Sequence, residues 1–215
     1  MEQQLWLVEG LPGSGKTTTA RLLAEAANAQ GRPARWWLEE ARDHPVLPSA
    51  LRKTAAQSGF VDDVLRSFEA FLRRENGVLI LEGAAFQNTV RFLYANDAPR
   101  DQIATHVRAW SGIVAHAKPR FLLLGIDDPR AHYMDFVATR RGEAWMTKLI
   151  AYVEQTPLAQ ARGWTGMNGL VLFWTEYRDL CGDLFASLPF PKLQVAATPA
   201  WAEGLSAEVG SFFGI

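Results

Sequence analysis

The feature that most constrains this 215-residue chain is a glycine-rich loop near its N-terminus. Residues 10–17 read Gly-Leu-Pro-Gly-Ser-Gly-Lys-Thr, a complete G-x-x-x-x-G-K-[ST] motif. An apolar run at 5–8 precedes the motif and predicts a strand, and helix-forming residues at 18–27 follow it. A strand, a glycine loop and a helix in this order are the context in which the motif binds phosphate. The sequence therefore predicts a phosphate-binding loop between a buried strand and a helix.

Different residues of the loop suit different parts of a bound phosphate. Glycines let successive N–H groups turn towards phosphate oxygens. The positive end of the helix dipole and the Lys16 ammonium attract the outer phosphates, and the Thr17 hydroxyl is a ligand for Mg²⁺. The candidate nucleotide-binding residues are Gly10, Leu11, Pro12, Gly13, Ser14, Gly15, Lys16, Thr17 and Thr18. The alternative is a structural turn, but a turn of that kind needs neither Lys16 nor Thr17.

The composition fits a single α/β domain spanning residues 1–215. At 48% hydrophobic residues, a chain of this length can bury a sizeable core. The formal net charge of −1 gives no reason to expect a nucleic-acid partner. The one cysteine, Cys181, excludes an intramolecular disulfide. Because neither a signal peptide nor an apolar run of membrane-spanning length is present, we expect a cytoplasmic protein without a membrane partner. A homodimer stays open.

Strand-type and helix-type patterns alternate along the chain. Further strands are predicted from apolar runs at 34–38, 78–81, 121–126 and 192–196. Helices are predicted from three-four spacing of apolar residues around 61–72, 103–114, 143–155 and 167–187, and over the tail at 200–213. A long connection is expected at 82–100. This alternation predicts a three-layer α/β/α fold with a five-stranded parallel sheet.

Acidic residues follow three of the predicted strands. Glu39 and Glu40 follow the second strand, Glu82 ends the third, and Asp127-Asp128 follows the fourth. Ligands of open parallel sheets lie beyond the carboxyl ends of the strands, so we expect these acids to lie beside the phosphate loop. Each alone could be a helix cap or a solvated turn. Together they favour a site for Mg²⁺ and a nucleotide, with a base for an acceptor hydroxyl.

With these features the chain resembles the P-loop kinases of small molecules, and is most similar to the thymidylate kinase and deoxynucleoside kinase branch. The resemblance rests on the phosphate loop, the acidic end of the second strand, Leu81-Glu82-Gly83 closing the third strand, and an arginine-rich segment late in the chain. It covers most of the chain in element order, but only the phosphate loop is a sharp motif. The resemblance implies a P-loop kinase fold with ATP and Mg²⁺ as ligands.

The resemblance also implies roles for individual residues. Lys16 and the loop amides would hold the β- and γ-phosphates of ATP. Thr17 and Glu82 would bind Mg²⁺, directly or through water. Glu39 would take the proton from the acceptor hydroxyl.

An arginine pair falls where such kinases carry a lid. Arg140 and Arg141 lie in a segment at about 130–145, between the fourth strand and the next predicted helix. In the lid role, their guanidinium groups would neutralise the transferring phosphoryl group and exclude water on closing. A solvated basic turn paired with Glu143 is the alternative.

The segment after the third strand departs from the thymidylate kinase pattern. That pattern has an Asp-Arg pair, whereas here Gly83-Ala84-Ala85-Phe86-Gln87-Asn88 follows Glu82, which disfavours a nucleoside monophosphate as acceptor. The candidate acceptor-binding residues are Glu39, Asp43, His44, Phe86, Gln87, Asn88 and Arg91. Phe86 and the two amides could stack on and hydrogen-bond a planar or polyhydroxylated acceptor, or could be core and helix caps. Arg91 could supply the missing charge.

The loop after the second strand gives a weaker indication. Asp43 and His44 could line the acceptor site, or Asp43 could stabilise a turn before Pro45. The other three histidines have helical or turn settings and are predicted to lie at the surface: His106, His116 and His132.

The function favoured by the sequence is that of a kinase. An ATP-dependent phosphotransferase would move a phosphoryl group to a small hydroxylated or phosphorylated metabolite, and a nucleoside or nucleotide kinase is an alternative within that class. Two other readings stay open: an NTPase switch that controls a partner, and a degenerate kinase that binds nucleotide without turnover. No guanine-recognition tetrapeptide of the Asn-Lys-x-Asp type supports the switch.

Overall fold

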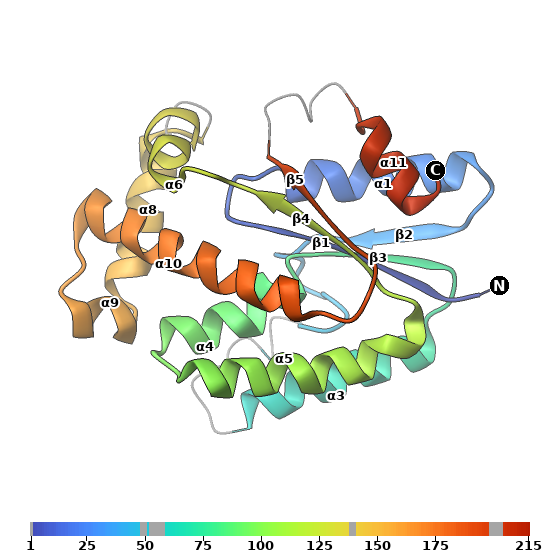
Figure 1. Cartoon of the computed structure of the whole chain (residues 1–215), viewed down its shortest axis with the longest axis horizontal. Coiled ribbons are helices and arrows are strands. Elements are labelled where there is room, and N and C mark those ends of the chain that lie inside the picture. The colour runs from blue at the N-terminus through green and yellow to red at the C-terminus, as the bar shows by residue number, and fades with distance from the viewer. Residues whose placement is uncertain (1, 48–50, 52–58, 138–140, 198–203) are drawn as a thin grey trace.

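The computed structural model describes residues 2–47, 51, 59–137, 141–197 and 204–215 (Figure 1). Within this part of the chain, one sheet has the strand order β2-β3-β1-β4-β5. Its strands are β1 (Gln4–Gly10), β2 (Ala34–Trp37), β3 (Val78–Glu82), β4 (Arg120–Gly125) and β5 (Lys192–Ala196). Every pairing is parallel. The predicted five-stranded parallel sheet is therefore confirmed.

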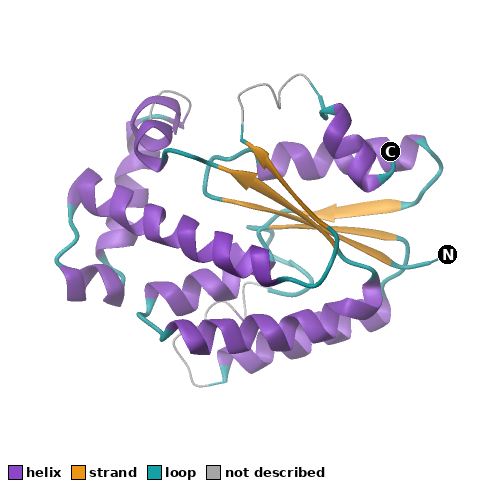
Figure 2. Ribbon diagram, in the orientation of Figure 1, coloured by secondary structure: helices purple, strands orange, loops and turns teal. Residues whose placement is uncertain are grey.

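Helices cover both faces of this sheet. The α-helices are α1 (Lys16–Ala29), α3 (Phe60–Arg74), α4 (Arg91–Ala95), α5 (Arg100–Val114), α6 (Pro129–Ala131), α8 (Glu143–Glu154), α9 (Pro157–Arg162), α10 (Gly166–Ser187) and α11 (Ala207–Phe213). The described chain also contains two π-helical segments, η1 (Ala85–Val90) and η3 (His132–Val137), and one 3₁₀ helix, η2 (Ala115–Ala117). Figure 2 shows α1 and α11 on one side of the strands and α3, α5 and α10 on the other. The three-layer architecture is confirmed.

The central strands are apolar on both faces because both faces are covered. Trp6 and Val8 pack against α1 and α11, and the Trp6 ring lies 4.7 Å from that of Phe213. Alternate residues of the same strand, Leu5 and Leu7, belong to the larger core on the opposite face. Because successive side chains of a strand point to opposite faces of the sheet, the apolar residues of β1 contribute to both cores.

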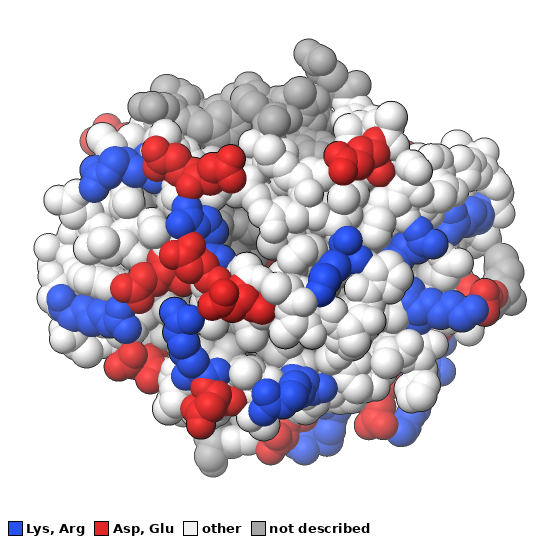
Figure 3. All heavy atoms as spheres, in the orientation of Figure 1, with Lys and Arg blue, Asp and Glu red and all other residues white. Residues whose placement is uncertain are grey.

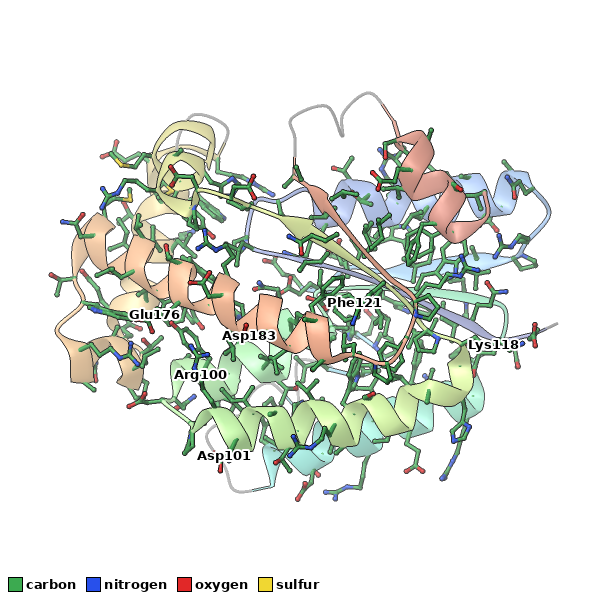
Figure 4. All side chains as sticks on the ribbon, in the orientation of Figure 1. Arg100, Asp101, Lys118, Phe121, Glu176 and Asp183 are labelled. Atoms are coloured by element: carbon green, nitrogen blue, oxygen red, sulfur yellow. The ribbon has the colours of Figure 1, made fainter. Side chains whose placement is uncertain are left out.

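The larger core is rich in aromatic side chains. Phe121 on β4 lies within it (Figure 4), with its ring 5.0 Å from Phe86 and 5.5 Å from Phe185 on α10. These three side chains tie β4, η1 and α10 together.

Most of the predicted helices are present. Those expected around 61–72, 103–114, 143–155 and 167–187 are α3, α5, α8 and α10, with ends that differ by a few residues. In the tail, α11 is present and residues 200–203 lie outside the described part. The connection expected at 82–100 is mostly helical, because η1 and α4 fill it. None of the described helices has the length and apolar character needed to cross a membrane.

Candidate functional site

A cleft of about 1530 Å³ opens at the carboxyl ends of the strands. Its lining includes residues 12–18 of the glycine loop, Glu39 and Glu40 after β2, Glu82 at the end of β3, and Asp127-Asp128 after β4. Parallel strands deliver all of their carboxyl ends to one edge, which is why segments so distant in sequence meet here. The structure brings the phosphate loop and the acidic strand ends together, as expected from the sequence. We call this region the phosphate-loop cleft.

The loop has the open, glycine-dependent backbone that its motif predicts. Gly13 and Gly15 have φ angles of 85° and 96°, in the left-handed region that other residues avoid. Gly15 is also the residue from which α1 begins. The positive end of α1 therefore faces the cleft, beside the N–H groups of the loop.

Lys16 is the cation at the mouth of the loop. Its ammonium group donates hydrogen bonds to the carbonyl oxygens of Gly10, at 3.0 Å, and Leu11, at 3.3 Å. The same nitrogen lies 3.7 Å from Glu39 Oε2. A buried cation thus lies between the loop and the carboxylate that follows β2.

Glu82 connects the loop helix with the segment after β2. The side chain is 1% exposed, and its Oε1 accepts hydrogen bonds from the Thr17 hydroxyl at 3.0 Å and from the Glu39 N–H at 3.1 Å. Within the described residues, Glu82 Oε2 has no hydrogen-bond partner. Burial raises the pKa of this carboxyl above its usual value. One lone carboxylate oxygen is therefore buried beside a hydroxyl at the base of the cleft.

This pair of oxygen groups fits Mg²⁺ better than a softer metal. Mg²⁺ is commonly bound by one or two protein oxygens together with substrate phosphates and water. Thr17 Oγ1 and Glu82 Oε2 supply hard oxygen donors next to the loop. No group of three or more His, Cys, Asp or Glu side chains able to hold a metal occurs in the described ranges. The donor set thus suits a cation that arrives with phosphate.

Gly83 makes room for the Glu39 carboxylate. Its φ angle is 60°, and a Cβ atom placed on it would collide with the carboxylate of Glu39. A glycine is therefore required at position 83 because the Glu39 side chain, from the segment after β2, approaches the backbone there closely. Any larger residue would push the segment after β2 away from β3.

Two loop residues lie apart from the cleft. Gly10 and Leu11 line a different cavity, behind the loop, and contribute to the cleft through the carbonyls that hold Lys16. Phe86 lines that same cavity and is 1% exposed. Its backbone carbonyl accepts the Tyr177 hydroxyl at 2.5 Å. The stacking role suggested for Phe86 is corrected to core packing, because its ring faces Phe121 rather than the cleft.

The expectation for Asp43 and His44 also needs correction. His44 is completely buried, and its Nδ1 accepts hydrogen bonds from the N–H groups of Val46 and Leu47. Asp43 is exposed, and neither residue is among those that line the cleft. His44 is therefore the residue that stabilises this turn, in the way that the sequence suggested for Asp43.

Besides Glu39, three of the acceptor candidates line the cleft: Gln87, Asn88 and Arg91. Asn88 is 7% exposed, and its Nδ2 has no hydrogen-bond partner within the described residues. The Arg91 guanidinium lies 5.2 Å from the centre of the Tyr152 ring, and its Nε donates to the Gln87 carbonyl at 2.7 Å. These residues add polar groups to the lining of the cleft. Its apolar lining comes from Phe60, Phe92, Trp145, Leu149 and Tyr152.

The lid candidates are only partly placed. Arg140 lies outside the described residues, whereas Arg141 is exposed and lines the cleft. Lys148 on α8 also lines the cleft. The lid role stays a prediction.

Two histidines differ from their expected surface positions. His132 lines the cleft, and its Nε2 donates a hydrogen bond to the Pro12 carbonyl of the loop at 3.0 Å. Burial lowers its pKa. His106 is 7% exposed, and burial lowers its pKa to about 4. The spacing of apolar residues did not predict that these two histidines are buried, because their burial depends on which other elements pack against them. His116 is exposed, as predicted.

Glu9 is a buried acid that the sequence did not single out. It lies within β1 and is fully buried, and its carboxylate accepts the N–H groups of Ala85 at 2.7 Å and Gln87 at 3.3 Å. Burial raises its pKa to about 7. The sequence feature that could have identified it is an acidic residue within an otherwise apolar central strand. Glu9 thereby holds the first turn of η1 next to the cleft.

The sheet and the phosphate loop together form a P-loop kinase-like fold. In particular, the chain is similar to the solved thymidylate kinase from Ehrlichia chaffeensis, with a TM-score of 0.51 and 12% identity over 99% of this chain and 95% of that one. It also matches deoxyadenosine kinase from M. mycoides with bound dATP, with a TM-score of 0.45 and 14% identity over 96% and 94%. No family model and no curated protein matches the sequence. At this identity the likeness establishes the fold, and the chemistry depends on the chain's own residues.

Proposed function

We propose that this protein is an ATP-dependent phosphotransferase that moves the γ-phosphoryl group of Mg-ATP to a hydroxyl of a small metabolite. The observation that carries the proposal is the pair formed by Lys16 and Glu39, with 3.7 Å between ammonium and carboxylate at the mouth of the loop. Phosphoryl transfer needs a cation at the outer phosphates and a carboxylate at the attacking hydroxyl, close to one another. The pair supplies both.

The loop side of the cleft would bind and orient the triphosphate. The Lys16 ammonium, now held by loop carbonyls, can turn to phosphate oxygens while the loop N–H groups and the α1 dipole hold the rest of the tail. Mg²⁺, bound by Thr17 and Glu82, would neutralise charge on the β- and γ-phosphates. Arg141 and Lys148 add positive charge to the lining of the cleft.

Glu39 would act on the acceptor. Its carboxylate takes the proton from the acceptor hydroxyl as that oxygen bonds to the γ-phosphorus, and ADP leaves with the electron pair of the broken P–O bond. The backbone bond from Glu39 N–H to Glu82, together with the space left by Gly83, fixes the position of this base. Position matters because the base must lie within hydrogen-bonding reach of the hydroxyl.

The apolar lining of the cleft favours an acceptor with a planar or apolar body. Phe60 and Phe92 pack edge to face with ring centroids 4.8 Å apart, and Trp145 and Tyr152 on α8 line the same cleft. The unpaired Asn88 amide and the Arg91 guanidinium would recognise oxygen atoms on that body. A nucleoside or a nucleoside monophosphate is the second candidate for the acceptor, and the likeness of the fold to that of a thymidylate kinase supports it.

An ADP-release assay over a panel of hydroxylated aromatics, sugars, nucleosides and nucleoside monophosphates tests the proposal. We expect acceptor-stimulated turnover that Lys16→Ala abolishes. Glu39→Gln should lower kcat by about 10²-fold or more while leaving the affinity for a non-hydrolysable ATP analogue nearly unchanged. The matched control is Glu69→Gln, which removes an exposed carboxylate on α3 and should have no effect.

Other outcomes would contradict the proposal in different ways. Slow hydrolysis that no acceptor stimulates would indicate an NTPase switch. Nucleotide binding without any turnover would indicate a degenerate kinase. A collapse of nucleotide affinity in Glu39→Gln would mean that Glu39 is structural or a metal ligand rather than the base.

A further inference from the structure

A second cavity lies behind the phosphate-binding loop, between α10 and the carboxyl ends of β4 and β5. Its volume is about 550 Å³, within the range of sites that enclose small molecules. We call it the α10 cavity. The lining residues that matter for its chemistry are Phe86, Leu123, Asp179, Cys181, Asp183 and Gln194. The proposed phosphoryl transfer uses none of these six side chains.

The inner wall of the α10 cavity is apolar. Phe86, Leu123 and Cys181 are 1%, 8% and 5% exposed, and together they offer an aromatic edge, a branched aliphatic group and a thiol. Burial raises the pKa of the Cys181 thiol, which keeps it neutral. A ligand that reaches this wall needs an apolar body, because a charged one would lose its hydration without a partner.

The rim of the cavity carries an excess of negative charge. Asp127, Asp179 and Asp183 line it, against the single cation Arg178. Arg178 is already engaged, because it pairs with Asp179 at 2.7 Å and donates to the Asp127 carbonyl at 2.5 Å. The Asp127 carboxylate has no hydrogen bond or ion pair within the described part of the chain. Acidic side chains accordingly gather over α10 on the face shown in Figure 3.

Asp183 is held only from the solvent side. Its partner is Arg100 on α5, 3.3 Å away, and both side chains are largely exposed. Figure 4 shows Asp183 and Arg100 on neighbouring helices at the outer surface of the molecule. An exposed pair of this kind contributes little, so a cation inside the rim can compete for the carboxylate.

Gln87 adds an independent indication of a ligand. The residue is 2% exposed and lies in the wall that the α10 cavity shares with the phosphate-loop cleft. Its side-chain amide makes no hydrogen bond to any described residue. A ligand oxygen or N–H in the cavity could therefore form a hydrogen bond with this amide.

We propose that the α10 cavity is a binding site for a small molecule with an aromatic or apolar body and a positively charged amine. The apolar body would lie against Phe86 and Leu123. The amine would lie among the three rim aspartates. The α10 cavity adjoins the phosphate-loop cleft, with which it shares Gln87 and Asp127, but the proposal does not depend on phosphoryl transfer.

Three matched probes test the ligand class: 2-phenylethylamine, 2-phenylethanol and 3-phenylpropanoate. They share an aromatic body and differ in the charge of the head group. Titrations followed by calorimetry or ligand-observed NMR should give the tightest binding for the amine, about five- to tenfold weaker binding for the alcohol, and none for the carboxylate. Equal binding of all three, or no binding by the amine, would overturn the proposal.

A cavity-filling variant tests the location. Gly182 on α10 lines the cavity, and a Cβ atom there would meet nothing within 4 Å, so Gly182→Leu extends into open space. We expect this variant to lose amine binding and to keep its affinity for a non-hydrolysable ATP analogue. Gly112→Leu is the matched control, because Gly112 is an exposed helical glycine on α5 with equally open space. Amine binding that survives in Gly182→Leu would overturn the assignment.

A second variant keeps the test decisive if Gly182→Leu does not fold. Asp183→Asn should weaken binding of the amine by about two- to fivefold and leave binding of the alcohol unchanged. Unchanged binding of the amine, or equal weakening of the amine and the alcohol, would contradict the charge argument.

Discussion

Glu9 offers a stringent test of the packing around the cleft, because its charge state couples to folding. The carboxyl is fully buried in β1, and its two hydrogen bonds come from backbone N–H groups of Ala85 and Gln87. Loss of solvation outweighs these bonds and the attraction of Lys16, and the pKa rises from 4.5 to about 7. Ionising this group in the folded protein is therefore harder than in the unfolded chain.

The size and sign of the effect follow from linkage. A pKa that rises from 4.5 to about 7 on folding corresponds to about 3 kcal/mol in the free energy of unfolding. Because the folded-state pKa is the higher one, this contribution is fully present below pH 4.5. It falls as the pH rises from 4.5 towards 7, and above about pH 7 it is lost.

The substitution Glu9→Gln isolates this effect. The glutamine amide does not ionise, and its carbonyl oxygen can still accept the N–H of Ala85. The N–H of Gln87 loses its acceptor, which costs about 1 kcal/mol at every pH. In urea unfolding between pH 4.5 and 8, the stability of the wild type relative to Glu9→Gln should therefore fall by about 3 kcal/mol. A relative stability that does not change with pH would refute the reasoning, and Glu69→Gln, at an exposed site, provides the baseline.

Two predictions concern the neighbours of the proposed base. Glu82→Gln keeps an oxygen that can accept from Thr17 and Glu39 but removes the metal-binding carboxylate, so the Mg²⁺ concentration for half-maximal ADP release should rise by about 10- to 100-fold; an unchanged Mg²⁺ titration would contradict the metal assignment. Gly83→Ala should lower kcat at least about tenfold with ATP-analogue affinity within about twofold, because the new methyl group displaces Glu39. Gly59→Ala is its control, since Gly59 also has a positive φ, of 91°, but a Cβ atom there would meet no atom of the described residues within 4 Å. Both alanines should cost about 1 kcal/mol of stability, and equal activity in the two would show that Glu39 had not moved.

The parts of the site that the sequence predicted are those encoded locally. The glycine loop needs only the backbone freedom of its own residues and the strand and helix on either side, all of which can be read within residues 5–27. The acidic strand ends were equally readable, because apolar runs mark where each strand stops. A parallel sheet then brings those ends to one edge whatever the order of its strands.

The parts that the sequence did not predict depend on contacts between distant segments. Phe86 and His44 have the residue types of a binding site, yet Phe121 and the turn at Val46 bury them. His132 was predicted at the surface, and its contact with Pro12 joins positions 120 residues apart. The strand order and the α10 cavity also depend on contacts between distant segments, so the sequence did not predict them. Each arises where elements pack, and periodicity within one element carries no information about its neighbours.

The position of Glu82 shows how strand order creates the site. β3 lies between β2 and β1, so a residue at the carboxyl end of β3 is flanked by the segment after β2 on one side and by the phosphate loop on the other. One carboxylate oxygen at that position accepts from Glu39 on the first side and from Thr17 on the second. The other oxygen stays available to a cation that the loop's phosphate ligand would bring. A single central acid thus fixes the proposed base relative to the phosphate site, and moving this acid to either neighbouring strand would lose one of its two contacts.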